Sequence, residues 1–232
     1  MNDNLQNLTL TAKEFETQRK AFAMAVLIAV AALLFWRRDE LDHLRPTEIA
    51  RMASSALVAV TLLFWVFYKW CWRWGRIPRW IGRPSINGVW IGSLSSDFGR
   101  AQGELPLVVP IAFVVRQSYL TLSIQSFTST QTGESKVEAL MHNARTDATR
   151  LAYVFELKNE YPGESSLVHG AGDLLLGAGD KVLQGHYWTS TPSNGNIRLR
   201  RVCVDCDDMR QFDDITARWP VGADWPGVIR IW

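Results

Sequence analysis

Two long apolar segments joined by a short charged connection constrain the fold of this chain more than any other feature. The first, residues 21–36, has no charged side chain and would be roughly 24 Å long as a helix. The second, residues 52–72, has Lys69 as its only charge and ends in a cluster of aromatic side chains. Such segments are typical of helices that cross a membrane. We therefore expect an α-helical two-span transmembrane hairpin over residues 21–72.

Two other interpretations of these segments fit less well. A helix in the core of a soluble protein should carry a polar stripe, and neither segment has one. A cleaved signal peptide should show an early apolar run with a small-residue cleavage site behind it. Here the run begins only at Ala21, ends at Trp36 and is soon followed by a second span. We expect the hairpin to be retained.

Basic residues are distributed unequally around the two spans. Four lie in the connection, namely Arg37, Arg38, Arg45 and Arg51. Eight precede the first span or close and follow the second: Lys13, Arg19, Lys20, Lys69, Arg73, Arg76, Arg79 and Arg83. Because Lys and Arg resist translocation, this distribution predicts a multi-pass protein whose N- and C-termini are both cytoplasmic.

Charge and cysteine content exclude several function classes. The net charge of +2 argues against DNA or RNA as partners. Three cysteines fit a reducing compartment better than a disulfide framework. Cys203 and Cys206 form a C-x-x-C, but no second pair or nearby histidine completes a zinc site. We expect no metal and no cofactor.

The hydrophobic pattern changes to strand-like alternation after residue 84. A polar leader (1–20) and the hairpin (21–72) are followed by a basic, aromatic linker (73–84), in which Pro78 and Pro84 should stop a helix. Beyond it we expect a β-domain over residues 85–202 and a tail over 203–232. The tail contains one possible short helix and an end anchored by Trp219 and Trp225.

Eight short strands separated by turn residues are predicted in the β-domain. They are residues 86–94, 107–117, 119–127, 135–141, 149–157, 167–176, 181–189 and 196–202. Consecutive strands without helices between them predict an up-and-down antiparallel β-barrel or a sandwich, and a closed barrel leaves no open edge. We expect an all-β soluble domain, an eight-stranded barrel able to hold one small ligand.

The first predicted strand carries a G-x-W motif, Gly88-Val-Trp90. This pattern resembles that of lipocalins and related barrels, in which the tryptophan closes one end of the barrel under an arginine of the last strand. The resemblance implies that Trp90 closes the barrel here. Arg198, Arg200 or Arg201 would then supply the cation–π cover.

The whole layout resembles one family of bacterial antiphage effectors. Besides the two spans and the G-x-W, the barrel contains Leu151-Ala-Tyr153, His169-Gly170, the run 183–189 and the run 195–200. These features resemble the two-transmembrane, β-strand-rich effectors of cyclic-oligonucleotide-based antiphage signalling (CBASS). The resemblance implies that the barrel binds a cyclic dinucleotide, which drives homo-oligomerisation, disruption of inner-membrane lipids and cell death.

A cyclic dinucleotide needs aromatic surfaces, positive charge and hydrogen-bonding groups together. Tyr153 and Tyr187 are the aromatic candidates, and Arg198 and Arg200 share one strand face and could meet phosphates. Thr121, Ser123 and Gln125 form a polar stripe that normally faces water but lines the pocket if it points inward. His169 and Thr189 complete the predicted site, although a lone strand histidine is more often a surface or core residue.

Two further function classes were weighed. A membrane-tethered lipocalin-like barrel could carry a lipid or another small apolar ligand, but the polar stripe and the paired arginines count against it. An enzyme is disfavoured because the four histidines (His43, His142, His169 and His186) show no metal spacing. No nucleophile elbow or carboxylate pair stands out either. We expect a non-enzymatic receptor and effector.

Overall fold

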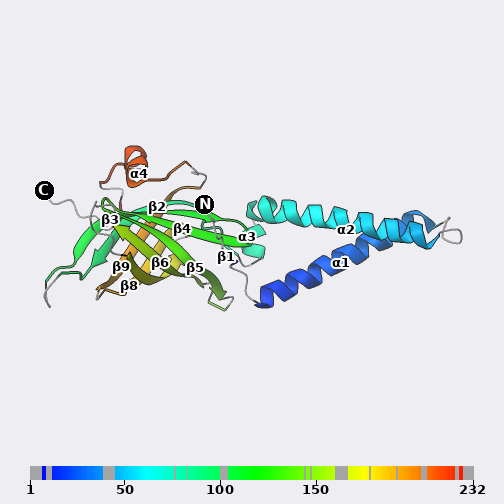
Figure 1. Ribbon diagram of the computed structural model, residues 1–232, viewed down its shortest axis with the longest axis horizontal. Helices are drawn as coiled ribbons and strands as arrows, with labels where there is room; N and C mark the ends of the chain where they lie inside the picture. Colours follow the sequence, from blue (N-terminus) through cyan, green and yellow to red (C-terminus); the bar gives the residue numbers. More distant parts are fainter. Residues whose placement is uncertain are drawn as a thin grey trace. The chain divides into compact units, whose positions relative to one another are not determined.

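The computed structural model divides the chain into a hairpin unit and a β-unit. The residues that it describes are 7–8, 12–38, 45–75, 77–81, 83–99, 104–143, 145–146, 148–159, 167–177, 179–191, 193–204, 208–222 and 225–226. The hairpin unit contains α1 (Ala12–Trp36) and α2 (Pro46–Lys69), which contact each other and converge toward their connection in the view of Figure 1. Behind α2, the short elements η2 (Cys71–Arg73) and α3 (Ile77–Trp80) fall within the predicted linker, where Pro78 limits helix length.

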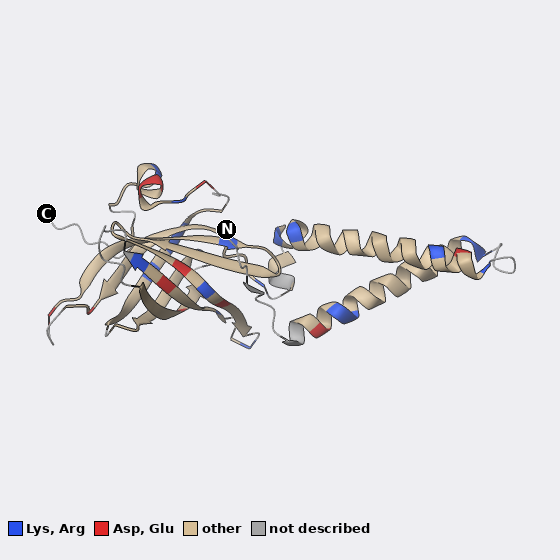
Figure 2. Ribbon diagram, in the orientation of Figure 1, with Lys and Arg blue, Asp and Glu red and all other residues tan. Residues whose placement is uncertain are grey.

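Both long helices have the length and hydropathy of membrane spans. The qualifying segments are Phe15–Trp36 and Pro46–Lys69, each with a mean hydropathy of 1.8. Their charged residues lie near the helix ends, and the middle of each helix carries none (Figure 2). Large side chains such as Leu27, Ile28 and Leu63 are exposed, so these are not core helices of a soluble protein. An apolar surface of this size indicates association with a membrane.

A hydrogen-bonded aromatic cluster holds one end of the hairpin unit together. The unit includes the turn Ser118–Leu120, and the side chain of Tyr119 is almost fully buried there. Gln18 Nε2 donates to Tyr119 Oη at 2.6 Å, and Tyr68 Oη donates to Gln18 Oε1 at 2.9 Å. The rings of Tyr68 and Tyr119 stack with centroids 5.1 Å apart. Tyr119 therefore links α1 to α2 through polar and aromatic contacts.

The β-unit is a closed barrel of eight antiparallel strands, as predicted (Figure 1). The strands are β2 (Gly88–Ser96), β3 (Leu107–Gln117), β4 (Thr121–Phe127), β5 (Gln131–Asn143), β6 (Ala148–Asn159), β7 (Leu167–Gly177), β8 (Val182–Thr189) and β9 (Ser193–Cys203). Each pairs with its sequence neighbours, and β2 pairs with β9 to close the barrel. A two-residue strand, β1 (Asn7–Leu8), adds to β4. The largest difference from prediction is β5, which is longer and contains a bulge near Ser135 that interrupts the alternation.

The side chain of Trp90, near the start of β2, is completely buried and packs in the barrel core. Its Nε1 donates to the Ile86 carbonyl oxygen at 2.8 Å. Of the three arginines considered, it is Arg201 whose guanidinium lies 5.2 Å from the Trp90 ring centroid. Burial lowers the pKa of Arg201, an effect that Asp180 opposes. Gly88 allows β2 to approach β9 closely, because it has a φ of +122° and a Cβ there would lie 1.9 Å from the Cys203 carbonyl oxygen.

The C-terminal segment covers part of the barrel's outer surface. The tail contains the expected short helix, α4 (Phe212–Arg218), which lies outside the barrel (Figure 1). Buried side chains of the segment pack on apolar residues that point outward from β2, β3 and β4; the cluster comprises Met209, Ile215, Trp225, Val89, Ile91, Ala112, Val114 and Phe127. Cys203, at the end of β9, is disulfide-bonded, which differs from the reduced cysteines expected.

Candidate ligand-binding site

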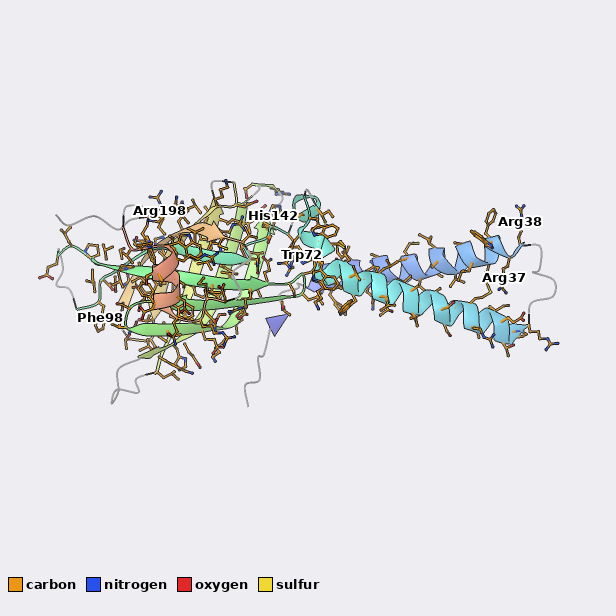
Figure 3. The ribbon with its side chains drawn as sticks, turned by 90° about the horizontal axis from the view of Figure 1, so that it is seen from above. Arg37, Arg38, Trp72, Phe98, His142 and Arg198 are labelled. Atoms are coloured by element: carbon orange, nitrogen blue, oxygen red, sulfur yellow. The ribbon has the colours of Figure 1, made fainter. Side chains whose placement is uncertain are left out.

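The barrel encloses a cavity of about 520 Å³ to which all eight strands contribute. Its lining includes residues of the β2–β3, β4–β5 and β8–β9 connections, so the cavity opens at this end, which we call the mouth. Exposed Phe98 marks the mouth and His142 the opposite end of the barrel (Figure 3). The volume lies in the ordinary range of small-molecule sites, roughly 300–1,000 Å³.

Aromatic side chains form the deep part of the cavity, which we call the floor: Phe113, Tyr153, Phe155 and Tyr187. The ring centroids of Phe113 and Tyr153 lie 5.8 Å apart in an edge-to-face arrangement, and those of Tyr153 and Phe155 are 5.5 Å apart. Tyr153 and Tyr187 are each only 5% exposed. The floor is therefore a packed aromatic surface that presents two phenol groups.

Uncharged polar side chains surround the mouth: Ser96, Thr128, Thr130, Gln131, Thr189, Thr191 and Ser193. Several bond to one another, which limits their rotation. Ser96 Oγ lies 3.1 Å from Ser193 Oγ, and Thr189 Oγ1 donates to the Thr191 carbonyl oxygen at 2.6 Å. These hydroxyls could donate to or accept from a polar ligand at the mouth.

The described part of the cavity lining is electrically neutral. None of the described residues that line it carries an ionic side chain. Burial raises the pKa of Tyr153 well above its ordinary value, and the neighbouring Tyr187 raises it further. The Tyr153 phenol therefore stays protonated at physiological pH and can act as donor or acceptor.

Comparison with known proteins gives one informative relative. No protein-family model matches the chain. It is 20% identical over 177 residues to "CD-NTase-associated protein 15" of Staphylococcus schleiferi, which covers 76% of this chain and 88% of the relative. The chain is a homologue of this CD-NTase-associated protein. The homology, the two apolar helices and the eight-stranded barrel together confirm the resemblance to the two-span β-barrel effectors of CBASS.

Three of the predicted site residues line the cavity. Tyr153 and Tyr187 lie at the floor, and Thr189 lies at the mouth. They come from β6 and β8, where alternate residues point inward with Leu151 and Leu183 of the barrel core. The structure therefore brings together the aromatic part of the predicted site.

The polar stripe of β4 lies on the outside of the barrel, so the expectation that it points into the pocket is wrong. Leu122 and Ile124 point inward, and alternation therefore directs Thr121, Ser123 and Gln125 outward. Gln125 Oε1 accepts a hydrogen bond from Arg116 Nη1 on the adjacent strand. The physical reason is that this part of the interior is apolar core, which leaves the polar residues to face water.

The predicted cationic residues also lie outside the barrel. Ile197 and Leu199 point inward from β9, so Arg198 and Arg200 point outward, and Arg198 lines a shallow outer groove with Arg150 and His186 (Figure 3). His169 is exposed on β7, with Nδ1 3.8 Å from Glu156 Oε1. The expectation that these three residues line the ligand pocket is wrong, because a guanidinium or an imidazole on the apolar inner face would be desolvated without a partner.

Sequence reasoning missed most of the remaining lining. Phe155 was detectable, because it lies two residues from Tyr153 and shares its strand face. Phe113 was hidden within a continuous apolar run. The mouth residues Thr128, Thr130 and Thr191 lie in connections, where hydroxyl side chains are ordinary turn residues and carry no specific signal.

We expect Gly172→Ala to damage the floor of the cavity. A Cβ at Gly172 would lie 2.5 Å from the Tyr153 ring, which packs between Phe113 and Phe155 and has little room to move. Overpacking of this kind should lower the free energy of unfolding by about 1–3 kcal/mol. Gly177→Ala on the same strand is the control, since nothing lies within 4 Å of its added Cβ. Equal unfolding midpoints in urea for the two variants would contradict the tight packing.

Substitution of two outward-facing residues tests whether the outer face of the barrel takes part in ligand binding. Ser123→Ala and Arg198→Ala should each change the affinity for any cavity ligand by no more than about twofold, because surface substitutions away from a site typically cost under ~0.5 kcal/mol. Titration calorimetry of each variant with a ligand of the cavity measures this change in affinity. A tenfold loss in either variant would show that the outer face takes part in binding.

Proposed function

We propose that the chain is an antiphage effector whose barrel binds a cyclic dinucleotide, which drives the transmembrane hairpin to oligomerise and disrupt the bacterial inner membrane. The observation that carries the proposal is a ligand-sized cavity in the same chain as two helices of spanning length. The CD-NTase-associated name of its homologue supports a role in CBASS. The proposal assigns binding, and no catalysis, to the barrel.

The chemistry of the cavity supports a nucleotide ligand. Aromatic side chains stack with bases of any sequence, and Phe113, Tyr153, Phe155 and Tyr187 provide such surfaces at the floor. The hydroxyl groups at the mouth can bond to ribose and phosphate oxygens. Base stacking in comparable sites is worth about 1–3 kcal/mol per base.

The membrane orientation of the proposal follows from the basic residues around the spans. Eight lie toward the helix ends nearest the termini and four lie in or next to the connection, where Figure 3 marks Arg37 and Arg38 beyond α1. With the termini in the cytoplasm, the barrel faces a second messenger that is made inside the cell. Labelling of single cysteines placed in the connection of intact cells would test this orientation.

Ligand binding and assembly should be coupled. Moving a population from 1:99 to 99:1 requires a ligand to favour the assembled state by about 5.5 kcal/mol. A ligand of micromolar affinity supplies about 8 kcal/mol in total, so most of its affinity must belong to the assembled form. Tight binding without a change in sedimentation would contradict the coupling.

The test of the proposed function is titration of the detergent-solubilised full chain with cyclic dinucleotides that carry adenine, guanine or uracil. Linear dinucleotides of the same bases are the controls. Saturable binding of a cyclic species, with a shift to larger particles in sedimentation velocity, is the expected result. No binding across the panel at micromolar concentrations would reject the receptor role.

A lipid or another small apolar ligand is the second candidate. Half of the residues that line the cavity are apolar, and none of those described is charged, which favours an uncharged or amphiphilic ligand. Native mass spectrometry of protein purified from cells distinguishes the two. A bound lipid retained by the barrel would favour this candidate.

A further inference from the structure

We propose that Tyr153 and Tyr187 read the hydrogen-bonding edge of one base at the cavity floor, while the hydroxyl groups at the mouth receive the sugar–phosphate part of the ligand. The proposal rests on the proposed function, because it orients a cyclic dinucleotide in the cavity. It adds which chemical group of the ligand enters first and which residues set base specificity.

The aromatic rings of the floor lie deep in the cavity, whereas its Ser and Thr hydroxyl groups gather toward the mouth, beside apolar side chains such as Phe98. On β8, Tyr187 lies at the floor and Thr189 at the mouth; on β9, Ile197 is deep and Ser193 is at the mouth. On β6, Tyr153 lies deeper than Leu157. A ligand with a flat aromatic part and an anionic part is therefore favoured with the base against the aromatic floor and the charged phosphodiester near solvent.

The two phenol groups are the strongest sign that the floor reads a polar edge. Both side chains are nine-tenths or more buried, and both line the cavity among mostly apolar neighbours. A ligand that fills the floor shields these hydroxyl groups from solvent, so it must offer them a matching donor or acceptor. A ligand that presents an apolar edge would leave them unpaired, and a site of this kind discriminates strongly.

The neutral state of the floor suits a base edge. Burial and the proximity of Tyr187 keep the Tyr153 phenol protonated, so it can donate a hydrogen bond or accept one. Base edges present donors and acceptors side by side, and a pair of phenols can match either. The edge-to-face contact with Phe113 fixes the Tyr153 ring, so little ordering remains to be done when the ligand binds.

The mouth, by contrast, carries groups that suit any sugar–phosphate ring. Ser96 and Ser193 lie on neighbouring strands within hydrogen-bond distance, and Thr189 is held by the Thr191 backbone. Cyclic dinucleotides with the same linkages share one phosphodiester ring whatever their bases, so contacts there should contribute equally to the affinity for each member of such a panel. Substitutions at the floor and at the mouth should therefore change the affinities for cyclic dinucleotides with different bases in different ways.

The experiment titrates the detergent-solubilised full chain and its variants with the adenine, guanine and uracil cyclic dinucleotides. Tyr153→Phe and Tyr187→Phe keep the ring and remove one hydroxyl. Each should weaken the tightest ligand by about tenfold and bring the affinities for the different bases closer together. Ser193→Ala should weaken all ligands of the panel by a similar factor and leave their ranking unchanged.

Tyr119→Phe is the matched control, since its hydroxyl bonds to Gln18 within the hairpin unit and does not line the cavity. Circular dichroism of each variant checks the fold. If the Tyr153→Phe and Tyr187→Phe variants bind the whole panel as the unmodified chain does, the assignment of the phenols is overturned while the receptor role stands. If the unmodified chain binds no member of the panel, the proposed function fails and this orientation fails with it.

Discussion

Replacing Trp90 by alanine should lower the free energy of unfolding of the barrel by about 3–5 kcal/mol, the usual cost of removing a fully buried tryptophan. The side chain is completely enclosed, donates to the Ile86 carbonyl oxygen and lies under the Arg201 guanidinium. Its loss leaves a cavity and an unpaired carbonyl in the barrel core. Urea unfolding of the full chain in detergent, followed by far-ultraviolet circular dichroism, measures the change.

Trp188→Ala is the matched control for this prediction. Trp188 lies on the outer face of β8 and is half exposed, so the same substitution should cost well under the Trp90 value. If both variants lost the same stability, Trp90 would not be a stabilising core residue of the barrel.

Deleting residues 1–76 should abolish membrane damage completely while changing the affinity for the cyclic dinucleotide by no more than about twofold, a difference typical of substitutions remote from a site. The deletion removes both spanning helices, whereas the described residues that line the cavity all fall in the range Leu94 to Ile197. Dye release from anionic phospholipid vesicles measures the damage, and titration calorimetry measures the affinity. Circular dichroism verifies that the shortened chain keeps its strands.

A full-length variant gives the same test without truncation. Leu62 is exposed in the middle of α2, and Leu62→Arg places a charge there at a cost of about 2.5–3.5 kcal/mol for insertion. We expect this variant to bind ligand and to release little dye. Dye release or toxicity from the barrel alone would refute the role of the hairpin.

The sequence predicted the elements of this protein well because their signals are local. The hairpin is visible as two uncharged apolar runs, and β3 begins and ends at the predicted residues, Leu107 and Gln117. β5 was predicted too short because its bulge breaks the period-two pattern. The tail helix was also visible, although its place on the outside of the barrel was not.

The site was predicted only in part because strand polarity does not identify the pocket face of a barrel that holds both apolar core and a ligand. On β4 the inward face is that of Leu122 and Ile124, so the polar stripe faces water. On β9 the same rule selects Arg201, which shares the face of Leu199, over Arg198 and Arg200. Chemistry alone favoured the wrong arginines for the pocket.

By itself, the sequence determined that this chain has two membrane-length helices and an all-β domain of consecutive strands, because hydrophobic periodicity and turn residues act over a few positions. Only the tertiary structure decided which side chains meet inside the barrel. Tyr153 and Tyr187 come together at the floor, and Ser96 meets Ser193 at the mouth, through the pairing of strands distant in the sequence. That pairing depends on register, and a shift of one residue would have turned each of these side chains outward.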